Sequence, residues 1–513
     1  MTKLSKKALL GESSYLSDLE IGFHGEKHPE KVMQFGEGNF LRAFVDLFID
    51  ESNDRGLFNG SIVILPPIPN TSDFANKLKA QDNCYTVLLR GLRDKKPIVQ
   101  KKIVSSVSRN IDMFTNFDEY MDAISNPHLR YIVSNTTEAG IVYVKTDKPS
   151  SEAKEPPSSF PAKITSLLYR RFEVFEGAAD AGFIFIPCEL IDNNGTELKQ
   201  AVLKHAKDWG LPLGFVDWVE SSNHFTNTLV DRIVTGYPKD EVEKLSEELG
   251  YRDELLVTGE IFHFFAFEAD EKAKKEIEES FSFHKAGLDV VLTDDVTPYK
   301  IRKVRILNGA HTMSVLAAFL SGKDTVLEMM EDKLFSKFLN RGIFEEILPS
   351  IAAYQHEVGK ISLTDDDLTS FANSVFDRFA NPYIKHNLLS IALNSVSKFK
   401  ARVLPSILDY QKSKGEIPPV LTFSFAALLA FYQGAKWPGN KENREYEVQD
   451  TDDVLEIFKK AGGDNFAKDI MQSEELWGID LCKLPGFAET VNGYLTGIHS
   501  DGMKQEIEKL LVL

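Results

Sequence analysis

The chain contains 513 residues, a length for which two or three domains are expected. With 43% hydrophobic and 27% charged residues, its composition is that of an ordinary soluble globular protein. The formal net charge of −18 at pH 7 argues against a nucleic-acid or anionic-membrane partner, because most of the surface would repel phosphate groups. A small anionic substrate would need a local basic pocket.

The three cysteines, Cys84, Cys188 and Cys482, lie far apart and form no CxxC pair. This pattern is typical of a protein in a reducing cytoplasm and gives no zinc signature, so we expect no metal site. The first residues lack the apolar segment of a signal peptide. The longest apolar run, residues 420–432, is too short to cross a bilayer and predicts a buried helix. A cytoplasmic location without a membrane partner is therefore expected.

Short apolar segments alternate with helical patterns in the first part of the chain. They predict strands within residues 31–35, 61–67, 85–91, 101–109, 129–140 and 181–195. Apolar side chains at helical spacing follow the first strand, between Phe40 and Phe48. Strands that alternate with helices are typical of a parallel sheet with crossover helices. We therefore predict an α/β fold for this part.

The later part of the chain has a different pattern. Residues 145–161 are rich in Pro, Ser and Lys, and they predict an exposed loop inserted into the α/β part. Beyond residue 289 the strand patterns fade and amphipathic helical patterns extend to the C-terminus. We therefore expect an α/β domain with insertions at residues 1–288 and a mainly α-helical domain at residues 289–513.

The stretch "VMQFGEGNFLRAF", residues 32–44, has the order strand, G-x-G, helix. This order lets backbone N–H groups approach a pyrophosphate at the positive end of a helix. Gly36 would permit the tight turn, and Gly38 would remove the Cβ that blocks close approach. Arg42, one turn into the helix, could reach a phosphate oxygen.

Two features depart from the usual dinucleotide-binding motif. Leu41 stands where the third glycine of G-x-G-x-x-G is expected, and Pro66 and Pro67 stand where an acidic residue would end the second strand. A plain turn between strand and helix is therefore an equally good interpretation of the loop. The missing acid also leaves the choice between NAD and NADP open.

An unusual lysine lies in "PYKIRKVRILNGAHTMSV", residues 298–315, whose periodicity predicts a helix. On a wheel of about 100° per residue, Lys303 lies in the apolar stripe, whereas Arg302, Arg305 and Thr312 face solvent. A lysine is rarely buried without a reason. Burial disfavours the charged form of an amine and lowers its pKa towards neutrality, where it both donates and accepts protons. Lys303 is therefore a candidate general acid/base.

Two polar side chains follow on the same predicted helix. Asn308 and His311 are three residues apart and are therefore neighbours on one face. An amide and an imidazole beside a lysine could hold a substrate oxygen as it changes between ketone, alkoxide and alcohol. The alternative is structural: a lysine that reaches the surface, an asparagine bonded to a neighbouring loop, and a core histidine with satisfied hydrogen bonds.

Several segments together resemble the polyol-specific long-chain dehydrogenase family, which includes mannitol 2-dehydrogenase, fructuronate reductase and tagaturonate reductase. They are "FGEGNFLRAF", "NTTEAG", "FPAKITSLLYRRF", "CELIDNNG", "FTNTLVDRI", "PYKIRKVRILNGAH" and "NPYIKHNLLSIALNSVSKFKARVLPS". The specific element is K-x-x-x-x-N-x-x-H, and the resemblance extends from about residue 30 to the C-terminus. Within the family the sequence is most similar to the tagaturonate reductases, also called altronate oxidoreductases. Phe44, where mannitol-type members tend to carry His, and "SKFKARVLPS" indicate this subgroup.

The resemblance implies a Rossmann-type N-terminal domain, a mainly α-helical C-terminal domain and an active site in the cleft between them. It also implies metal-independent hydride transfer with NAD as cofactor, NADP not being excluded. By motif matching, Lys303 is the acid/base, and Asn308 and His311 hold the reacting oxygen. Asn194 of "DNNG" is implied as a further amide donor. The residues implied to contact the cofactor are Gly36, Gly38, Phe40, Arg42, Thr137 and Glu138.

The implied reaction is the reversible, NAD-dependent reduction of D-tagaturonate to D-altronate in hexuronate breakdown. A hexuronate carries a carboxylate, for which Lys398 and Arg402, four apart on one helix face, are candidates. His386 and Asn381 are further candidates for substrate binding, although each of the four could instead form a salt bridge or a helix cap. Fructuronate reductase, a mannitol or polyol 2-dehydrogenase, and a nucleotide-binding sensor without catalysis remain alternatives. We expect a monomer or homodimer that acts on a small molecule.

Overall fold

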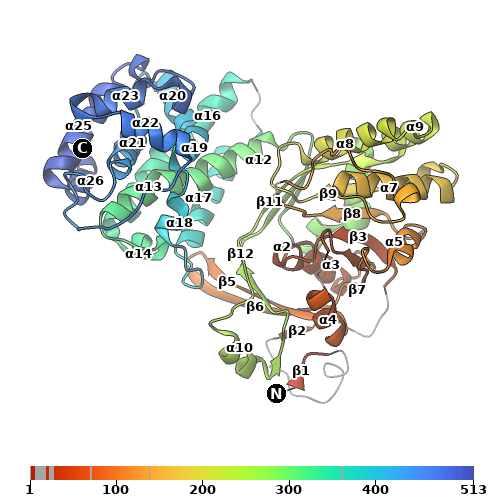
Figure 1. Ribbon diagram of the computed structural model, residues 1–513. Helices are drawn as coiled ribbons and strands as arrows, with labels where there is room; N and C mark the ends of the chain where they lie inside the picture. The colour runs from red at the N-terminus through yellow and green to blue at the C-terminus, as the bar shows by residue number, and fades with distance from the viewer. Residues whose placement is uncertain are drawn as a thin grey trace. The chain divides into compact units, whose positions relative to one another are not determined.

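The computed structural model describes residues 2–5, 19–21, 28–69, 72–137, 139–359 and 362–512. The chain forms two compact units, which are seen in Figure 1. The first comprises Met1–Gly91 and Pro97–Val296, and the second comprises Leu92–Lys96 and Thr297–Leu513. The boundary expected at residues 288/289 precedes β16 (Val290–Thr293), which pairs in parallel with β15 (Phe264–Glu268) of the first unit.

The first unit is built on a six-stranded parallel sheet with the order β10-β9-β8-β3-β4-β7. Its strands are His224–Phe225 (β10), Ile184–Pro187 (β9), Tyr131–Ser134 (β8), Glu30–Phe35 (β3), Ser61–Leu65 (β4) and Val107–Asn110 (β7). Along the chain, β4 and β7 extend the sheet on one side of β3, and β8 and β9 then extend it on the other. The strand order therefore reverses at β3, where doubly wound sheets bind their ligands. The predicted parallel sheet is confirmed.

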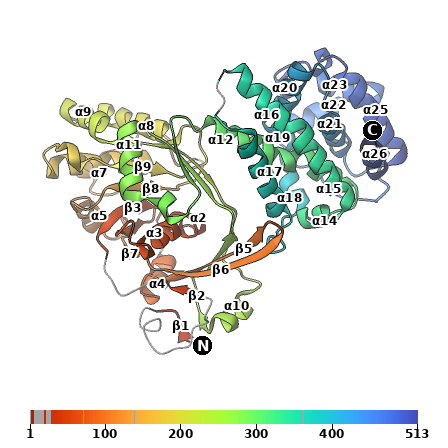
Figure 2. The same cartoon turned by 180° about the vertical axis from the view of Figure 1, so that it is seen from behind.

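Helices cover both faces of this sheet (Figure 2) because its strands are apolar on both sides. Met33 and Phe35 point towards one face and pack with α5, α7, α8 and α9, whereas Val32 points towards the other, where α3 packs. The helices of the first unit are Asn39–Arg42 (α2), Val45–Asp54 (α3), Ser72–Ala80 (α4), Phe117–Ala123 (α5), Ser150–Ala153 (α6), Phe160–Val174 (α7), Asn194–Asp208 (α8), Leu213–Ser222 (α9), Val242–Leu249 (α10), Glu271–Glu276 (α11) and the π-helix Ile277–Phe281 (η2).

Smaller sheets extend the first unit. A five-stranded sheet has the order β12-β14-β5-β6-β2, a three-stranded sheet has the order β11-β15-β16, and β1 pairs with β13. Their further strands are Thr2–Lys3 (β1), Leu19–Ile21 (β2), Tyr85–Arg93 (β5), Lys96–Val104 (β6), Asn227–Asp231 (β11), Val234–Gly236 (β12), Tyr251–Arg252 (β13) and Val257–Glu260 (β14).

The strand predicted at residues 101–109 is present only in its first part, because this segment divides between two sheets. β6 ends at Val104 and β7 begins at Val107. The two serines between them bond to α3: the Ser105 N–H donates to Asp50 Oδ1 (2.7 Å), and the Ser106 hydroxyl donates to the Asp46 carbonyl oxygen (2.9 Å). These side-chain bonds satisfy the polar groups at the break between the strands.

The loop predicted at residues 145–161 is more ordered than its composition indicates. It contains the short helix α6, and Asp147 accepts hydrogen bonds from the backbone N–H and hydroxyl groups of Ser158 and Ser159. Ser150 is 1% exposed. The composition predicted an exposed loop because it is rich in polar residues. Hydrogen bonds within the loop, rather than to solvent, satisfy polar groups of Asp147, Ser158 and Ser159.

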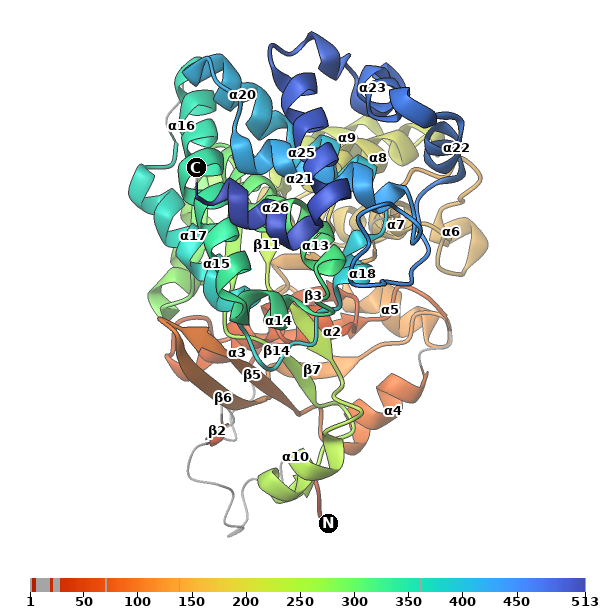
Figure 3. The ribbon, with the colours of Figure 1, turned by 90° about the vertical axis from the view of Figure 1, so that its left-hand side faces the viewer.

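Helices form the second unit apart from its segment Leu92–Lys96 (Figure 3). They are Thr297–Arg302 (α12), Lys303–Asn308 (η4), Gly309–Leu320 (α13), Val326–Glu331 (α14), Lys333–Asn340 (α15), Arg341–Ile347 (η5), Leu348–Glu357 (α16), Asp365–Phe379 (α17), Leu388–Ala392 (α18), Ser395–Arg402 (α19), Leu404–Lys414 (α20), Pro419–Tyr432 (α21), Asp452–Lys460 (α22), Phe466–Gln472 (α23), Glu474–Trp477 (α24), Phe487–Asp501 (α25) and Met503–Leu510 (α26). Short 3-10 turns are present in both units.

The most apolar helix, α21, lies at the centre of the second unit, packed against α13 and α25. Every residue from Val420 to Tyr432 is buried, which confirms the helix predicted there. Among the described residues, no helix is both long and apolar enough to span a membrane.

A buried carboxyl group caps the start of α21. Glu346 of η5 is 2% exposed and accepts hydrogen bonds from the backbone N–H groups of Val420 (2.8 Å) and Leu421 (2.9 Å). The two hydrogen bonds satisfy donors that the first turn of a helix leaves unpaired. Burial nevertheless disfavours the charged form and raises the pKa of Glu346 to about 7.

We predict that Glu346→Gln changes how stability depends on pH. Because the folded-state pKa of Glu346 lies above its unfolded value, its contribution to stability is fully present below about pH 4.5 and is lost as the pH rises through 7. Between about pH 5 and pH 8 the wild type should therefore lose about 2 kcal/mol relative to the variant. Denaturation followed by tryptophan fluorescence, to which Trp437 and Trp477 of the second unit contribute, measures the difference.

Glu345→Gln is the matched control, because Glu345 is the exposed neighbour of Glu346. This control should run parallel to the wild type at every pH. A constant difference between wild type and Glu346→Gln across the pH range would contradict the prediction.

Candidate active site

The glycine loop follows β3, at the reversal point of the parallel sheet. Gly36 has a φ of +129°, and a Cβ there would lie 3.1 Å from the Asn135 carbonyl oxygen and 3.2 Å from a methyl group of Leu41. The chain itself therefore requires glycine at this position. Gly38 differs, because a Cβ built on it would meet no atom within 4 Å. The backbone at Gly38 therefore faces open space.

Arg42 stabilises the glycine loop from the protein interior, through hydrogen bonds. Its buried guanidinium donates to the carbonyl oxygens of Leu255 (2.5 Å) and Glu37 (3.2 Å) and to Asn39 Oδ1 (2.6 Å). Burial lowers its pKa. These contacts hold the loop and use three of the five N–H donors of the guanidinium, so the expected contact of Arg42 with a phosphate stays a prediction. Phe40 stacks on Phe44 with a centroid distance of 4.9 Å and remains half-exposed.

A network of buried polar side chains lies beneath the loop. The Tyr85 hydroxyl donates to Asp46 Oδ2 (2.7 Å), and the Gln34 amide donates to the Gly36 carbonyl oxygen (3.0 Å). Asp46 is completely buried, and burial raises its pKa to about 7. These residues come from β3, α3 and β5, so the network joins three elements under the glycine turn. No sequence motif indicated it.

Glu37, between the two glycines, carries an unsatisfied carboxyl oxygen. Its Oε2 is buried and has no hydrogen-bond partner among the described residues. Burial raises the pKa of Glu37 to about 7; its own backbone N–H and Arg42 act in the opposite direction, and Asp112, which follows β7, adds to the rise. A carboxyl group that titrates near neutrality therefore lies in the loop, on the side of β4 and β7.

A second loop, which follows β8, approaches the glycine loop through Asn135. Thr137 in this loop is exposed and has a φ of +90°, a conformation that β-branched residues rarely adopt. Such strain is typical of functional loops. Glu138, the other predicted cofactor residue here, lies outside the described residues.

Glu189, which sequence reasoning missed, ties this second loop to the end of β9. The buried carboxylate accepts hydrogen bonds from the Ser134 hydroxyl (3.0 Å) and from the Thr136 N–H (3.0 Å) and hydroxyl (2.9 Å). The only available signal was an acidic residue directly after an apolar strand, in "IPCE".

Asn194 begins α8 and is completely buried. Its amide nitrogen donates to the carbonyl oxygens of Pro187 (3.0 Å) and Glu189 (3.1 Å), and its Oδ1 accepts from the Thr228 N–H (2.9 Å). Both amide protons are therefore engaged by the protein, in contrast to the expected role as a donor to substrate. Asn194 instead fixes the turn between β9 and α8.

In the second unit, the helix predicted over residues 298–315 contains a π-helical turn, η4, between α12 and α13. A π-helix bonds residue i to residue i+5, so each residue turns by roughly 80° rather than about 100°. Asn308 then lies within roughly 50° of Lys303, whereas a continuous α-helix would put it at about 140°. His311, three α-helical residues later, falls within roughly 20° of Lys303. At this ideal pitch the three side chains would share one face of the helix.

The wheel assignment of the neighbouring side chains is wrong. Arg302, Arg305 and Thr312 are buried rather than solvent-facing, with exposures of 8%, 7% and 5%. Arg305 pairs with Asp409 (2.5 Å), because α20 packs where solvent was expected. Lys303 is half-buried. An amphipathic pattern read at 3.6 residues per turn misjudges a helix that is wound differently and has neighbours on several sides.

His311 is almost fully buried, and its Nδ1 has no hydrogen-bond partner among the described residues. Its ring stacks on Phe379 (centroid distance 4.0 Å) and meets His386 edge-on (5.5 Å). Burial lowers the pKa of His311 well below its usual value, and the charges of His386, Arg378, Arg402 and Lys398 lower it further. His311 is therefore neutral at physiological pH.

The residues whose charges lower the pKa of His311 include three that were predicted to bind substrate, namely His386, Lys398 and Arg402. Lys398 donates to the Ile391 carbonyl oxygen (2.9 Å), and Arg402 donates to the Thr312 hydroxyl (3.4 Å). Neither forms an ion pair with any residue that the structure describes, so they do not form the salt bridges that were the alternative. Burial lowers the pKa of both groups.

Two further polar residues, the neutral Asn381 and the cationic Arg378, lie at the end of α17 and just after it. Asn381 is 2% exposed, and its Oδ1 accepts from the Tyr383 N–H (3.0 Å) in the turn after α17. Arg378, three residues earlier, is buried near His311 and was missed in the sequence. No grouping of three or more metal-ligating side chains is found in the described part of the chain.

Comparison with known proteins agrees with this division into units. The family model of the mannitol dehydrogenase Rossmann domain matches residues 30–280, and that of the mannitol dehydrogenase C-terminal domain matches residues 295–498. Altronate oxidoreductase of Yersinia enterocolitica is 44% identical over 495 residues, which are 94% of this chain and 98% of that protein. Altronate oxidoreductase of Escherichia coli is 43% identical over 498 residues, 95% of this chain and 98% of the relative.

Two solved structures have the same fold at low sequence identity. Mannitol 2-dehydrogenase of Pseudomonas fluorescens, in ternary complex with NAD and D-mannitol, is 21% identical with a TM-score of 0.69, and the match covers 100% of both chains. A substrate-free D-sorbitol dehydrogenase is 20% identical with a TM-score of 0.79, over 98% of this chain and 100% of the other. Because both family models match and relatives above 40% identity span nearly the whole chain, this protein belongs to the mannitol dehydrogenase family.

Proposed function

We propose that this protein catalyses the reversible, NAD-dependent reduction of D-tagaturonate to D-altronate. The observation that carries the proposal is the identity of 43–44% to altronate oxidoreductases over nearly the full length of both chains. The geometry of the second unit agrees with it, because an anionic substrate needs cations that the protein has not already paired.

The first unit has the features that a dinucleotide requires. The space beside Gly38, which a side chain would partly fill, lies at the carboxyl end of the central strand, and Thr137 is exposed on the loop that faces it. NAD bound there would supply or accept the hydride. Gly36, Gly38, Phe40, Thr137 and Glu138 would hold the cofactor, and Arg42 and Glu189 would position their loops.

A residue of the second unit, Lys303, would transfer the proton. In the reducing direction, the protonated Lys303 amine donates a proton to the carbonyl oxygen as it becomes an alkoxide. In the oxidising direction, the neutral amine takes that proton from the alcohol. Asn308 lies on the same face of the helix and would donate an amide hydrogen bond to the same oxygen.

His311 would orient the oxygen rather than exchange its own proton. Because its pKa is well below the usual value, the imidazole stays neutral and donates one N–H without competing with Lys303. The substrate carboxylate would bind to Arg402 and Lys398, with His386 and Asn381 contacting other oxygens. Asn194 acts in this proposal only by fixing the turn after β9.

The first test is a substrate panel with NADH, in which we predict the highest kcat/KM for D-tagaturonate, above D-fructuronate and far above D-fructose.

Arg402→Met should raise KM for the uronates by about tenfold or more, because a forked, charged hydrogen-bond donor to the carboxylate is lost. The rate with the neutral ketose should change less than about twofold.

Lys400→Met is the control for this prediction, since Lys400 lies exposed on the same helix between Lys398 and Arg402. A preference for D-fructose would reassign the substrate within the family. An equal loss for charged and neutral substrates in Arg402→Met would remove that residue from carboxylate binding.

If Lys303 is the general acid, its removal should slow the chemical step without weakening the binding of NADH. Lys303→Ala should lower kcat by about 10²- to 10⁴-fold, because the proton donor is gone, while the Kd for NADH changes less than about twofold. Single-turnover kinetics and fluorescence titration measure the two effects separately. Lys333→Ala, at an exposed position on α15, is the control. Retention of more than about a tenth of wild-type kcat would exclude Lys303 as the general acid.

Because no acidic residue ends β4, the sequence did not decide between NAD and NADP. The position of Glu37 leads to a prediction of this preference. Charged Glu37, on the side of β4 and β7, would repel the 2′-phosphate of NADP, so NADH should be preferred. Because the pKa of Glu37 is about 7, the carboxylate is largely neutral at pH 6 and charged at pH 8. The kcat/KM ratio of NADH to NADPH should therefore rise by about tenfold between these pH values and stay flat in Glu37→Gln. A ratio independent of pH in the wild type would contradict this assignment.

A further inference from the structure

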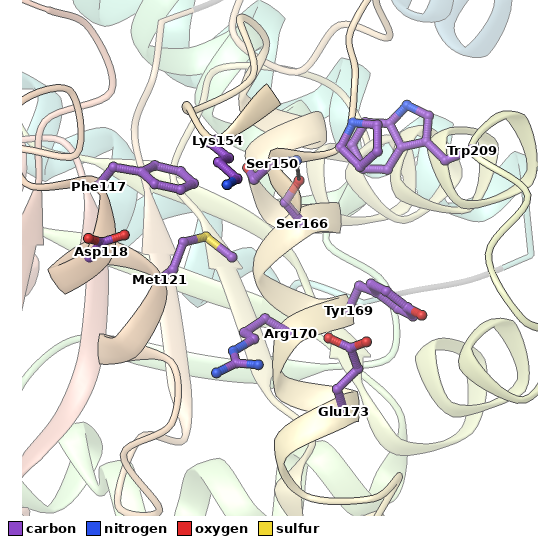
Figure 4. Close-up of a pocket in the computed structure, with 11 residues that line it drawn as sticks. Phe117, Asp118, Met121, Ser150, Lys154, Ser166, Tyr169, Arg170, Glu173 and Trp209 are labelled. Carbon is purple, nitrogen blue, oxygen red and sulfur yellow. Dashed lines mark hydrogen bonds between the residues drawn. The ribbon is translucent and has the colours of Figure 1, made fainter. Parts of the chain in front are cut away.

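A cavity of about 340 Å³ lies in the first unit, formed by α5, α6, α7 and the residue that ends α8 (Figure 4). This volume is in the range of small-molecule sites. The residues that line it are Phe117, Asp118, Met121, Pro149, Ser150, Lys154, Ser166, Tyr169, Arg170, Glu173 and Trp209. None of them belongs to the glycine loop, to the loop after β8 or to the second unit, so the proposed reaction does not use this cavity.

The walls of the cavity are apolar and half-buried. Phe117 and Met121 come from one face of α5, and Tyr169 comes from α7. The indole of Trp209 lines another side and donates its N–H to the Asp147 carbonyl oxygen (2.9 Å). These side chains can enclose the flat apolar part of a ligand.

The floor of the cavity carries a polar group without a partner. Ser150 is 1% exposed, and its hydroxyl has no hydrogen-bond partner among the described residues. The neighbouring Ser166 hydroxyl accepts from the Ser150 backbone N–H (3.1 Å). A buried, unpaired hydroxyl is costly unless something else satisfies it, and Ser150 lines a space in which a ligand oxygen would do so.

Two cations border the same space. Figure 4 shows the Lys154 amine above and the Arg170 guanidinium below the region beside Met121. Neither forms an ion pair or a side-chain hydrogen bond with any residue in the described ranges. In a protein with a net charge of −18, two unpaired cations at one cavity favour an anion.

The charge on the rim limits the size of that anion. Asp118 and Glu173 also line the cavity. Two acidic side chains beside two basic ones would repel a polyphosphate or nucleic acid while leaving room for a single negative charge.

We propose that this cavity is a second ligand site, which binds a small monocarboxylate with a ring-sized apolar body. The ring lies between Phe117, Met121 and Tyr169. The carboxylate accepts hydrogen bonds from Arg170 and Lys154, and the Ser150 hydroxyl donates to the ligand from the floor.

Trp209 permits a test on the intact protein with phenylacetate as the probe. The chain has four tryptophans, and only Trp209 lines the cavity. After labelling with 5-fluorotryptophan, phenylacetate should shift the ¹⁹F resonance of Trp209 in a saturable way, with a Kd below about 5 mM, and leave those of Trp218, Trp437 and Trp477 in place. Benzyl alcohol, which lacks the carboxylate, and inorganic phosphate, which lacks the ring, should bind at least about fivefold more weakly.

Two variants separate ligand binding from a structural role. Arg170→Gln should weaken phenylacetate binding by at least about fivefold, whereas Lys207→Gln, which removes the same charge two residues from Trp209 but outside the cavity lining, should not. Ser150→Ala should weaken binding about threefold without lowering the melting temperature of the ligand-free protein, because the hydroxyl makes no hydrogen bond there.

Some outcomes would overturn the site. These are an unmoved Trp209 resonance, equal shifts of all four resonances, or equal affinity for benzyl alcohol. Because the assay needs neither substrate nor NADH, its failure would leave the proposed reaction untouched, and failure of the reaction would leave this site untouched.

Discussion

The chemistry proposed for this protein depends on one irregular turn of helix. A continuous α-helix over residues 298–315 would point Asn308 away from Lys303, whereas the pitch of the π-helical turn would bring these two side chains and His311 to one face. A π-turn is less favourable than an α-turn, so its surroundings must stabilise it. Gly309 lets the end of α19 approach, with the Arg402 carbonyl oxygen 3.2 Å from where a Cβ would lie, and Arg305 is anchored to Asp409. The same packing that stabilises the turn also brings Arg402 close to His311.

The two units share a common design in which buried polar residues hold the groups that contact ligand. In the first unit, Arg42 and Glu189 use their charges on backbone groups of the loops and thereby fix Gly38 and Thr137. In the second unit, Arg305 and Thr312 have this supporting role beside Lys303 and His311. Lys398 and Arg402 form no ion pair with the residues that the structure describes, which leaves their charge available for a substrate in an otherwise acidic chain.

The sequence predicts the elements that follow a regular period and misses those that do not. The strands near residues 31–35, 61–65 and 131–134 and the helix α21 are found where their apolar runs predict them. The break between β6 and β7 and the π-turn are missed, because each depends on tertiary contacts and violates the period assumed. Family motifs identified Lys303, Asn308 and His311 as a set. Glu189 and Arg378 were not found, since each is a single charged residue whose partners are distant in sequence.

The central claim is that Lys303 and Asn308 act on the same substrate oxygen, and a double-mutant cycle in kcat tests it most directly. Lys303→Met and Asn308→Ala should each slow the reduction of D-tagaturonate, and Asn308→Ala should cost several-fold less in the Lys303→Met background than it costs in the wild type. Losses that multiply fully, with no coupling between the two positions, would mean that the residues act independently and would contradict the alignment derived from the π-turn.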